Sequence, residues 1–317
     1  MAMAGKFLLH YGYVTVRQYG VESSGALPAK KPELMSTISK PIPPPFRTAR
    51  WRRERDSNAE SLCAITLIVA TNRAAHSVMM AIPNLLNNFL LAAFPKGSWE
   101  GIRSEIRDVR LPLGQAIYEP GSTVRHVYFP TTAMISLTCG TSDGESAQIA
   151  VVGNEGMVGV TLLLGGETTS SRAVVTGAGQ AFTLPAEAIK KEFASCGEIR
   201  HLLLRYTQAL STQVSQTAAC NRHHTLDQQL CRWLLMCLDR AQDNNLVMTH
   251  ELISNLLGVR REGITDSARK MQAVGLIRYR RGHISVLDRE GLEQLSCECY
   301  AVVKHEYDRL LVCSPDS

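Results

Sequence analysis

The sequence predicts an α+β fold, in which an N-terminal jelly roll or β-roll precedes a long helix and a C-terminal winged helix-turn-helix. Three observations predict it. Short apolar segments alternate with Gly, Pro and Asp turn signals between residues 80 and 185. A helical period of apolar residues takes over from residue 186. The segment Thr249–Leu287 then has the pattern of two short helices around a glycine turn, followed by a basic hairpin.

The composition is that of a globular protein with two domains and a tail. The chain has 317 residues, of which 45% are hydrophobic and 20% charged, and a formal net charge of +5. This mild positive charge is weak support for a nucleic-acid partner by itself. We expect four segments. They are an irregular or disordered extension (1–79), a β-roll (80–195), a long helix (196–222) and a winged helix-turn-helix domain (223–317).

The nine cysteines are scattered and contain no CxxC pair, which favours reduced cytoplasmic thiols over disulfides or a zinc finger. Cys297 and Cys299 are the closest pair. On a helix, residues i and i+2 point apart, so we expect this pair to make a poor metal site. The sequence therefore predicts neither a metal nor an iron–sulfur cofactor.

The first 79 residues show no clear periodicity. They contain the proline-rich Pro41–Pro45 and the basic Arg47–Arg55, and we expect the natural start near Met79 and Met80. The apolar run Leu62–Ala70 is too short for a bilayer, which needs about 20 apolar residues. We therefore expect a cytoplasmic protein without a membrane partner.

Residues 80–185 begin with an amphipathic stretch, Pro83–Phe94, and then follow the pattern of short strands. Many short strands separated by turns are typical of a β-sandwich or jelly roll. The expected strands are Ala116–Tyr118, His126–Pro130, Ala133–Leu137, Gln148–Val152, Arg172–Thr176 and Gln180–Leu184.

Helices are predicted from residue 186 onward. A short helix covers Ala186–Phe193, a long one Gly197–Ala219, and a third Leu226–Asp239. In the long helix, apolar side chains recur at steps of four, three and four, which is the spacing of a coiled-coil seam. A helix packed on its own domain would show the same stripe, and both interpretations stay open, with the dimer favoured. The expected dimer-interface residues are Ile199, Leu203, Tyr206 and Leu210.

The helix-turn-helix pattern begins at Thr249, a good N-cap, and turns at Gly258, with the second helix starting near Arg260. We expect Ile264, Ala268 and Met271 to form the buried face of the second helix. Ser267 occupies a position where an apolar residue would pack better. Gly263 costs about 1 kcal/mol relative to alanine; it either lets the backbone approach a phosphate or is simply tolerated.

The outer face of the second helix and the hairpin tip have the chemistry of a DNA contact. Arginine can donate two hydrogen bonds to guanine, glutamate can accept one from cytosine, and basic tips bind phosphate. An ordinary solvated helix pair is the competing interpretation, and the added basic wing favours DNA binding. The candidate DNA-binding residues are Thr249, Arg260, Arg261, Glu262, Thr265, Asp266, Arg269, Arg280 and Arg281.

The segment Leu257–Thr265 resembles the recognition segment of the Crp/Fnr superfamily, and the resemblance extends from about Leu111 to Leu311. It implies that Arg261 and Glu262 read bases. Asp266 stands where the best-known members have arginine, so we expect a different operator sequence. The resemblance further implies a homodimer on near-palindromic DNA, with RNA polymerase as a partner.

The first half also resembles this superfamily, and Gly153–Gly159, Leu162–Gly166 and Ser171–Ala173 fall where cyclic-nucleotide-binding members hold the ligand. Arg172 matches the arginine that binds phosphate. Val160 falls on the glutamate that binds ribose and cannot accept a hydrogen bond. We therefore expect an unknown effector rather than cAMP or cGMP. The expected effector pocket consists of Gly153, Asn154, Glu155, Gly156, Gly159, Val160, Arg172 and Ala173.

The sequence favours a transcription regulator over two alternatives. One is a cyclic-nucleotide-binding module that acts on a protein partner, which would need neither the helix-turn-helix nor the wing. The other is an enzyme, for which we find no nucleophile elbow, Walker loop or HExxH motif. The clustered N-terminal cysteines of the superfamily's iron–sulfur members are also missing, and no histidine stands out as a haem ligand.

Overall fold

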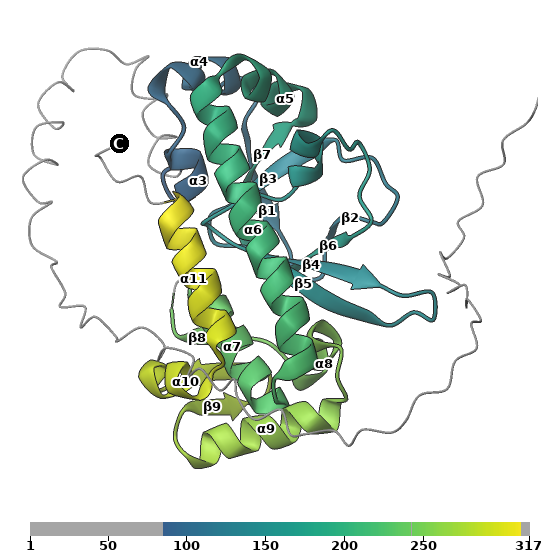
Figure 1. The fold of residues 1–317 in the computed structure, drawn as a ribbon, viewed down its shortest axis with the longest axis vertical. Coiled ribbons are helices and arrows are strands. Elements are labelled where there is room, and N and C mark those ends of the chain that lie inside the picture. Colours follow the sequence, from purple (N-terminus) through teal and green to yellow (C-terminus); the bar gives the residue numbers. More distant parts are fainter. Residues whose placement is uncertain (1–84, 242, 312–317) are drawn as a thin grey trace, which may run out of the picture. The chain divides into compact units, whose positions relative to one another are not determined.

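A computed structural model describes residues 85–241 and 243–311, and the extension expected at 1–79 lies outside this part. Short helices lead into two antiparallel sheets, a long helix follows, and a second unit of helices with a small sheet comes after it (Figure 1). The α+β class with a β-roll and a winged helix-turn-helix is confirmed.

The β-roll is built from a three-stranded sheet of order β1-β7-β3 and a four-stranded sheet of order β2-β6-β4-β5. Its strands are β1 (Arg107–Leu111), β2 (Ala116–Tyr118), β3 (His126–Pro130), β4 (Met134–Gly140), β5 (Ser146–Val152), β6 (Arg172–Gly177) and β7 (Gly179–Pro185). All expected strands are present. β1 was not predicted because only Leu111 within it is buried.

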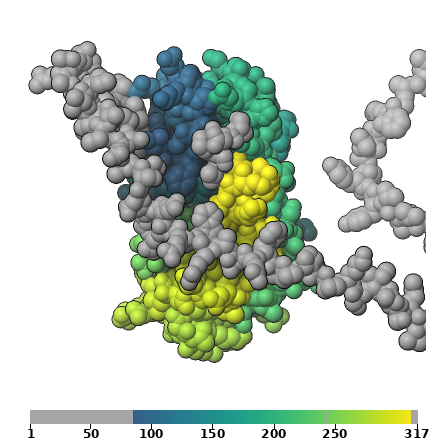
Figure 2. Space-filling view, turned by 60° about the vertical axis from the view of Figure 1, so that its left-hand side comes forward, coloured from purple at the N-terminus to yellow at the C-terminus, as the bar shows by residue number. Residues whose placement is uncertain are grey.

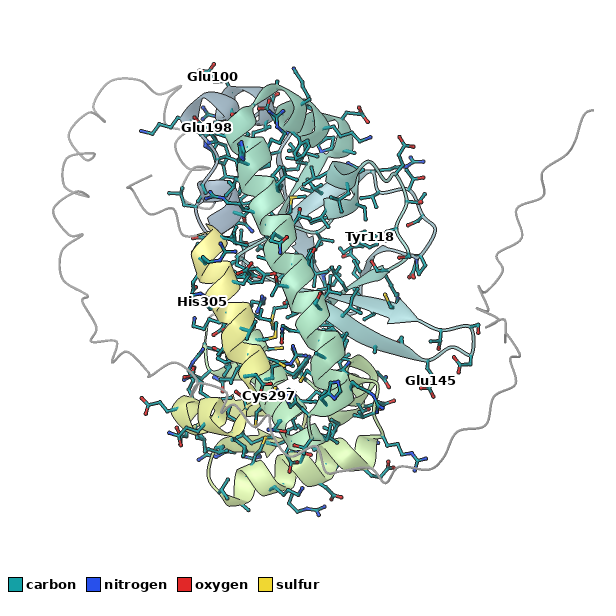
Figure 3. All side chains as sticks on the ribbon, in the orientation of Figure 1. Glu100, Tyr118, Glu145, Glu198, Cys297 and His305 are labelled. Atoms are coloured by element: carbon teal, nitrogen blue, oxygen red, sulfur yellow. The ribbon has the colours of Figure 1, made fainter. Side chains whose placement is uncertain are left out.

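Strand β4 departs from the alternation that the sequence suggested. Its first five residues are all buried, so both faces of this strand are covered. One face packs into the roll, and Ser136 donates or accepts a hydrogen bond with Thr176 of β6 at 2.8 Å. Beyond Gly140 the hairpin to β5 projects outward, with Glu145 near its tip (Figure 3).

Short helices close one end of the roll. They are α3 (Phe89–Ala92), η1 (Lys96–Ser98) and α4 (Trp99–Ile102). Phe94 meets Phe129 of β3 edge to face at 6.1 Å. The fully buried Asn88 caps α3 and donates hydrogen bonds to the carbonyls of Pro130 and Gly156, at 2.8 and 2.9 Å. This one side chain therefore ties the N-terminal helices to two separate segments of the roll.

The 3-10 helix η2 (Val160–Leu164) lies between β5 and β6, and the helices α5 (Ala186–Ser195) and α6 (Gly197–His223) follow the roll. The last helix, α11 (Glu298–Leu311), packs along α6 (Figure 1) and lies on the surface between the N-terminal helices and α6 (Figure 2). The rings of Tyr206 and Tyr307 meet edge to face at 6.4 Å, and the Tyr206 hydroxyl donates to the carbonyl of Met157 at 2.8 Å.

This packing corrects the expected dimer seam. Ile199, Leu203 and Tyr206 are fully buried and Leu210 is 5% exposed within a single chain. A second protomer was expected to pack on this seam because the sequence showed no other segment that would cover it. That premise is wrong, since α11 and the roll cover this face. The stripe is therefore that of a helix packed on its own protomer.

The second unit is a winged helix-turn-helix. It comprises α7 (Leu226–Leu238), β8 (Asn245–Val247), α8 (His250–Leu257), α9 (Arg261–Ala273), β9 (Ile277–Arg280), β10 (His283–Val286) and α10 (Arg289–Leu295). The strands form a sheet of order β8-β10-β9, of which β8 was not predicted. Thr225 and Gln228 form a capping box that starts α7 directly after α6.

Side chains from α6 and α7 connect the second unit to the roll. The Trp233 indole donates to Gln148 Oε1 at 2.9 Å, and the Gln213 amide donates to the carbonyl of Val151 at 3.0 Å. These buried polar contacts require specific partners, so they fix how the helices sit on β5. Within the part of the chain that the structure describes, no helix is long and apolar enough to cross a bilayer.

Candidate nucleic-acid interface

The turn between α8 and α9 has the predicted geometry. The Thr249 hydroxyl accepts a hydrogen bond from the amide of Leu252 at 3.1 Å, which caps α8. Gly258 ends the helix with a φ of 65°, a left-handed conformation that glycine adopts without strain. A Cβ at Gly258 would also lie 3.3 Å from the Cβ of Ala147 in β5, so this turn is close to the roll.

The recognition helix α9 begins at Arg261 and buries Ile264, Ala268 and Met271, as expected. The opposite face carries the exposed side chains of Arg261, Glu262, Asp266 and Arg269. Arg260 occupies the N-cap position with an extended backbone. The helix therefore presents its N-terminal turn and one polar face to solvent, which is the arrangement that enters a major groove.

Two residues that looked unfavourable in α9 have structural reasons. A Cβ on Gly263 would lie 2.7 Å from Cδ2 of Leu226, so glycine here lets α9 approach the start of α7. Ser267 is 3% exposed, and its hydrogen bond lowers the pKa of Asp227 in α7. Both residues therefore serve the contact between α7 and α9.

His250 organises the interface, although sequence reasoning did not single it out. Its ring stacks on Tyr279 of β9 with centroids 3.9 Å apart, and its Nδ1 lies 3.1 Å from the Thr265 hydroxyl. Because Thr265 donates to the carbonyl of Arg261, its oxygen accepts from the Nδ1–H of His250. Burial, and the positive charge of Arg261, lower the pKa of His250. A neutral imidazole therefore joins α8, α9 and the wing.

The wing is the predicted hairpin. His283 pairs with Arg280, and Arg281 and Gly282 form the turn with φ values of 48° and 82°. Positive φ at both central residues is typical of the tight type I′ turn. The side chains of Arg278, Arg280 and Arg281 are exposed on this hairpin.

The basic side chains of this surface fall into two groups. Arg269 pairs with Asp266 at 3.0 Å, and Lys270 pairs with Asp227 at 2.9 Å. The second group has no carboxylate within ion-pair distance among residues 85–241 and 243–311. Its members are Arg260 and Arg261 at the start of α9, Arg280 and Arg281 at the wing tip, and Arg278 in β9. These five guanidinium groups keep their donors free for a phosphate or a base.

The residues expected to form an effector pocket do not come together. Glu155 turns toward the C-terminal end of α7, where its carboxylate lies 2.7 Å from Arg240, two residues beyond the helix. A Cβ at Gly156 would lie 2.3 Å from the Tyr206 ring, and one at Gly153 would lie 2.7 Å from Arg240. The Gly153–Gly156 loop, with Asn154, therefore packs against the helices. The expected pocket is wrong for this loop because its partners come from distant parts of the chain.

The other expected pocket residues lie at η2 and β6. Gly159 precedes η2, which begins at Val160, and Ala173 is fully buried. Arg172 starts β6, and its Nε lies 3.0 Å from the Glu119 carboxylate, with both side chains about half exposed. The candidate phosphate-binding arginine therefore has an acidic partner in this structure.

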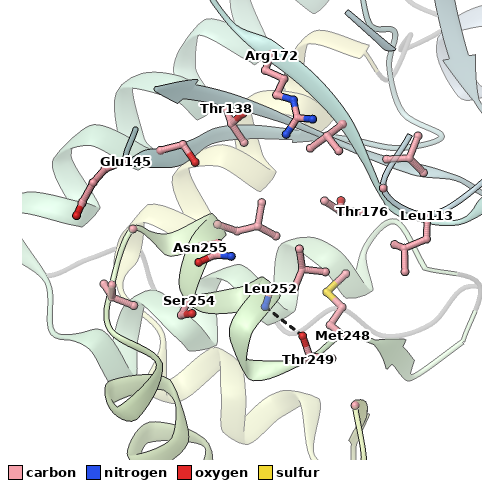
Figure 4. Close-up of a pocket in the computed structure, with 18 of the residues that line it drawn as sticks. Leu113, Thr138, Glu145, Arg172, Thr176, Met248, Thr249, Leu252, Ser254 and Asn255 are labelled. Atoms are coloured by element: carbon pink, nitrogen blue, oxygen red, sulfur yellow. Dashed lines mark hydrogen bonds between the residues drawn. The ribbon is translucent and has the colours of Figure 1, made fainter. Parts of the chain in front are cut away.

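A cleft of about 1150 Å³ separates the outer face of the roll from α8 (Figure 4). Arg172, Thr138 and Glu145 line it from the roll, and Thr249 and Asn255 line it from the helix-turn-helix. The cleft is therefore bordered by both halves of the protein.

Comparison with known proteins assigns both halves. The family model for the cyclic nucleotide-binding domain matches residues 108–196, and the model for the Crp-like helix-turn-helix domain matches residues 228–295. A curated relative, the global nitrogen regulator of Synechococcus elongatus, is 24% identical over 209 residues, which span 60% of this chain and 93% of the relative.

Solved structures show the same fold. A transcriptional regulator of the Crp/Fnr family from Eubacterium rectale superimposes with a TM-score of 0.53 at 19% identity, covering 65% of this chain and 96% of its own. FixK2 from Bradyrhizobium japonicum gives a TM-score of 0.54 at 16% identity, covering 61% and 98%. The order of β-roll, long helix and winged helix-turn-helix is thus shared along nearly the full length of both structures.

Proposed function

Because the chain belongs to the Crp/Fnr family of DNA-binding transcription regulators, we propose that it binds a near-palindromic operator as a homodimer and responds to an effector other than a cyclic nucleotide. The observation that carries the proposal is the group of five exposed arginines without carboxylate partners at the start of α9 and on the wing.

Base reading is assigned to Arg261 and Glu262. Both are exposed in the first turn of α9, from which a side chain reaches a base edge in the major groove. Asp266 holds Arg269 in an ion pair one turn further along. This neutral pair replaces a free arginine, which supports an operator that differs from those of the best-known members. Arg280 and Arg281 are assigned to backbone phosphates, with Arg260 and Thr249 beside them.

A homodimer is supported by the other face of α6. Exposed residues recur there at steps of three and four, and Leu204 is 43% exposed. They are His201, Leu204, Gln208, Ser211, Ser215 and Ala218. The three small side chains among them, Ser211, Ser215 and Ala218, would let two helices approach closely toward the C-terminal end of α6. A twofold axis along this face would present two α9 helices to half-sites about 34 Å apart. RNA polymerase is the proposed protein partner on that DNA.

The effector is proposed to bind on the Arg172 side of the roll. Val160 offers no acceptor for a ribose hydroxyl, and Glu119 neutralises Arg172. Both features oppose cAMP and cGMP. The cleft beside Arg172 is also lined by α8, so a ligand there would contact the sensory and DNA-binding halves together.

The decisive experiment measures specific binding after Arg261→Ala. We expect about 10- to 100-fold weaker binding to the selected operator, with little change on a scrambled site, because a bidentate arginine–guanine contact contributes about 1–3 kcal/mol of discrimination. Arg110→Ala, which removes an exposed arginine from β1, is the matched control. An equal loss on both sites would refute base reading by Arg261.

The dimer is tested separately by Leu204→Glu, which places a carboxylate on the exposed face of α6. We expect monomers in light scattering and loss of operator binding. Leu164→Glu is the control, because Leu164 is 62% exposed on η2, away from α6. A dimer that survives Leu204→Glu unchanged would place the interface elsewhere.

A further inference from the structure

Four potential metal ligands gather where the C-terminal end of α6 meets the start of α11. They are Cys220, His224, Cys297 and Cys299, and their ligand atoms all lie within 4.8 Å of one another. Figure 3 labels Cys297 at this junction. The three cysteines are at most 4% exposed and form a buried cluster separate from the main hydrophobic core. We propose that these residues bind one zinc ion.

The expectation that Cys297 and Cys299 make a poor metal site is therefore corrected. It assumed that both lie on a helix, where their side chains would point apart. Helix α11 begins only at Glu298, so Cys297 precedes it in a non-helical conformation. Cys220 and His224 are spaced i and i+4 at the end of α6, and this spacing places both on one side of the helix.

The distances fit a single tetrahedral ion. Sγ of Cys220 lies 3.5 Å from Sγ of Cys297, and Sγ of Cys299 lies 3.6 Å from Nδ1 of His224. Zinc–sulfur bonds of about 2.3 Å and a zinc–nitrogen bond of about 2.0 Å hold tetrahedral ligand atoms roughly 3.5–3.8 Å apart. An iron–sulfur cluster would hold its thiolates further apart, because several atoms lie between them. Three cysteines and one histidine also form a closed structural zinc set.

The histidine is oriented as a metal ligand is. Its Nδ1 faces Cys299, and its Nε2 lies 3.3 Å from the Glu298 carboxylate. A carboxylate that accepts from the other ring nitrogen fixes the tautomer and raises the basicity of the ligating nitrogen. Glu298 is therefore a positioning residue that acts through His224. Binding would release the thiol protons to solvent as the cysteines become thiolates.

The site would fix the hinge between the two halves. Gln229 of α7 donates to the carbonyl of His224 at 2.9 Å and to that of Cys220 at 3.5 Å. The ligands thus lie on the connection through which α7 leaves α6, and the ion would tie that connection to α11. The inference does not depend on DNA binding, so the two proposals fail separately.

The test is the metal content of the full chain purified under reducing conditions with zinc supplied. We expect about one zinc per chain by mass spectrometry of the metal, and intense visible bands of a tetrahedral thiolate complex after cobalt replaces zinc. A chain that carries iron and sulfide, that forms a Cys220–Cys297 disulfide under these conditions, or that holds no metal would overturn the proposal.

Variants locate the ion. His224→Ala and the double variant Cys297→Ser/Cys299→Ser should lose bound zinc, whereas His224→Cys keeps four ligands and should retain it. Cys139→Ser, at an exposed cysteine of β4, and Cys237→Ala, at a buried one of α7, should also retain it. Glu298→Gln should weaken zinc affinity by about 10- to 100-fold. Equal zinc binding by His224→Ala and His224→Cys would contradict the assignment even if the double variant does not fold.

Discussion

The arginines of the DNA-binding surface and those that border the β-roll have opposite environments. At the start of α9 and on the wing, Arg261 and Arg281 are exposed and carry no ion pair to a described residue. Around the roll, Arg240 is 5% exposed in its side chain and held by Glu155, while Arg172 is paired with Glu119 at the surface. Arginine is therefore available to a partner outside the chain on the DNA-binding surface, and it is paired with a carboxylate of the same chain around the roll.

The difference separates arginines whose charge is used inside the fold from arginines whose charge is available to a ligand. A buried guanidinium needs a carboxylate because unpaired burial is costly. An exposed one is stable alone, so the missing partners on the wing have no cost to folding. Substitutions at the buried ion pair beside the roll should therefore lower the stability of the fold. Substitutions of the unpaired arginines on the DNA-binding surface should instead weaken DNA binding.

The largest expected effect follows Glu155→Ala. Removing this carboxylate leaves the buried Arg240 without its ion pair, and breaking such a pair costs about 3–5 kcal/mol. Urea unfolding followed by circular dichroism measures the loss. Glu119→Ala breaks the exposed pair with Arg172 and should cost less than about 1 kcal/mol. Similar losses in both variants would abolish the distinction between the two regions.

A second prediction compares an unpaired and a paired arginine on the DNA-binding surface. Arg281→Ala should weaken binding to all sequences alike and flatten the slope of log affinity against log salt by about one, because one phosphate contact is lost. Arg269→Ala should change the slope much less, since Asp266 already neutralises Arg269. Fluorescence anisotropy at several salt concentrations measures both. A larger effect from Arg269 would show that its ion pair opens on DNA.

A third prediction concerns the surface pair on the roll. Glu119→Gln removes the negative charge beside Arg172 and frees its guanidinium group for an anion. We expect the affinity for phosphate-bearing anions to rise only several-fold, because an exposed ion pair contributes little energy. Binding of cAMP should stay weak, because Val160 still lacks an acceptor. Titration calorimetry on the variant and on Glu119→Gln/Arg172→Ala tests this. Equal gains in both would assign the effect to another cation.

The smallest expected effect is a pH dependence from His250. Its folded-state pKa is lowered from the ordinary value of about 6.5 by burial and by Arg261. The unfolded chain therefore binds this proton more readily, so the stabilisation is complete above pH 6.5 and is lost as the pH falls through the folded-state pKa. Thermal unfolding of the wild type and of His250→Asn, compared between pH 7.5 and 5.5, isolates the contribution of His250 to the pH dependence of stability. An identical pH dependence in both proteins would contradict the prediction.

Elements set by local chemistry could be predicted from the sequence. The cap at Thr249, the positive φ at Gly258 and the tight turn at Arg281 follow from residue type within a few positions. Strands β2 and β3 were predicted at their observed bounds because turn signals flank their apolar residues. The outward face of α9 also followed from its helical period alone.

Features that depend on distant partners could not be predicted in this way. The stripe on α6 was assigned to a dimer because α11 was not recognised as its cover. Glu155 was assigned to a ligand because Arg240, its partner, lies 85 residues away. The metal ligands were missed for the same reason, although the i, i+4 spacing of Cys220 and His224 was a usable signal.

The pairing of α6 with α11 also bears on the order in which the chain folds. Contacts between segments far apart in sequence form slowly, because a long stretch of chain must first be closed into a loop. The winged helix-turn-helix lies between these two helices in the sequence, so we expect it to form before they meet. Until then the part of the α6 stripe around Tyr206, which Tyr307 of α11 covers in the folded chain, is open to water. This stripe is the surface through which a half-folded chain would aggregate or be held by a chaperone.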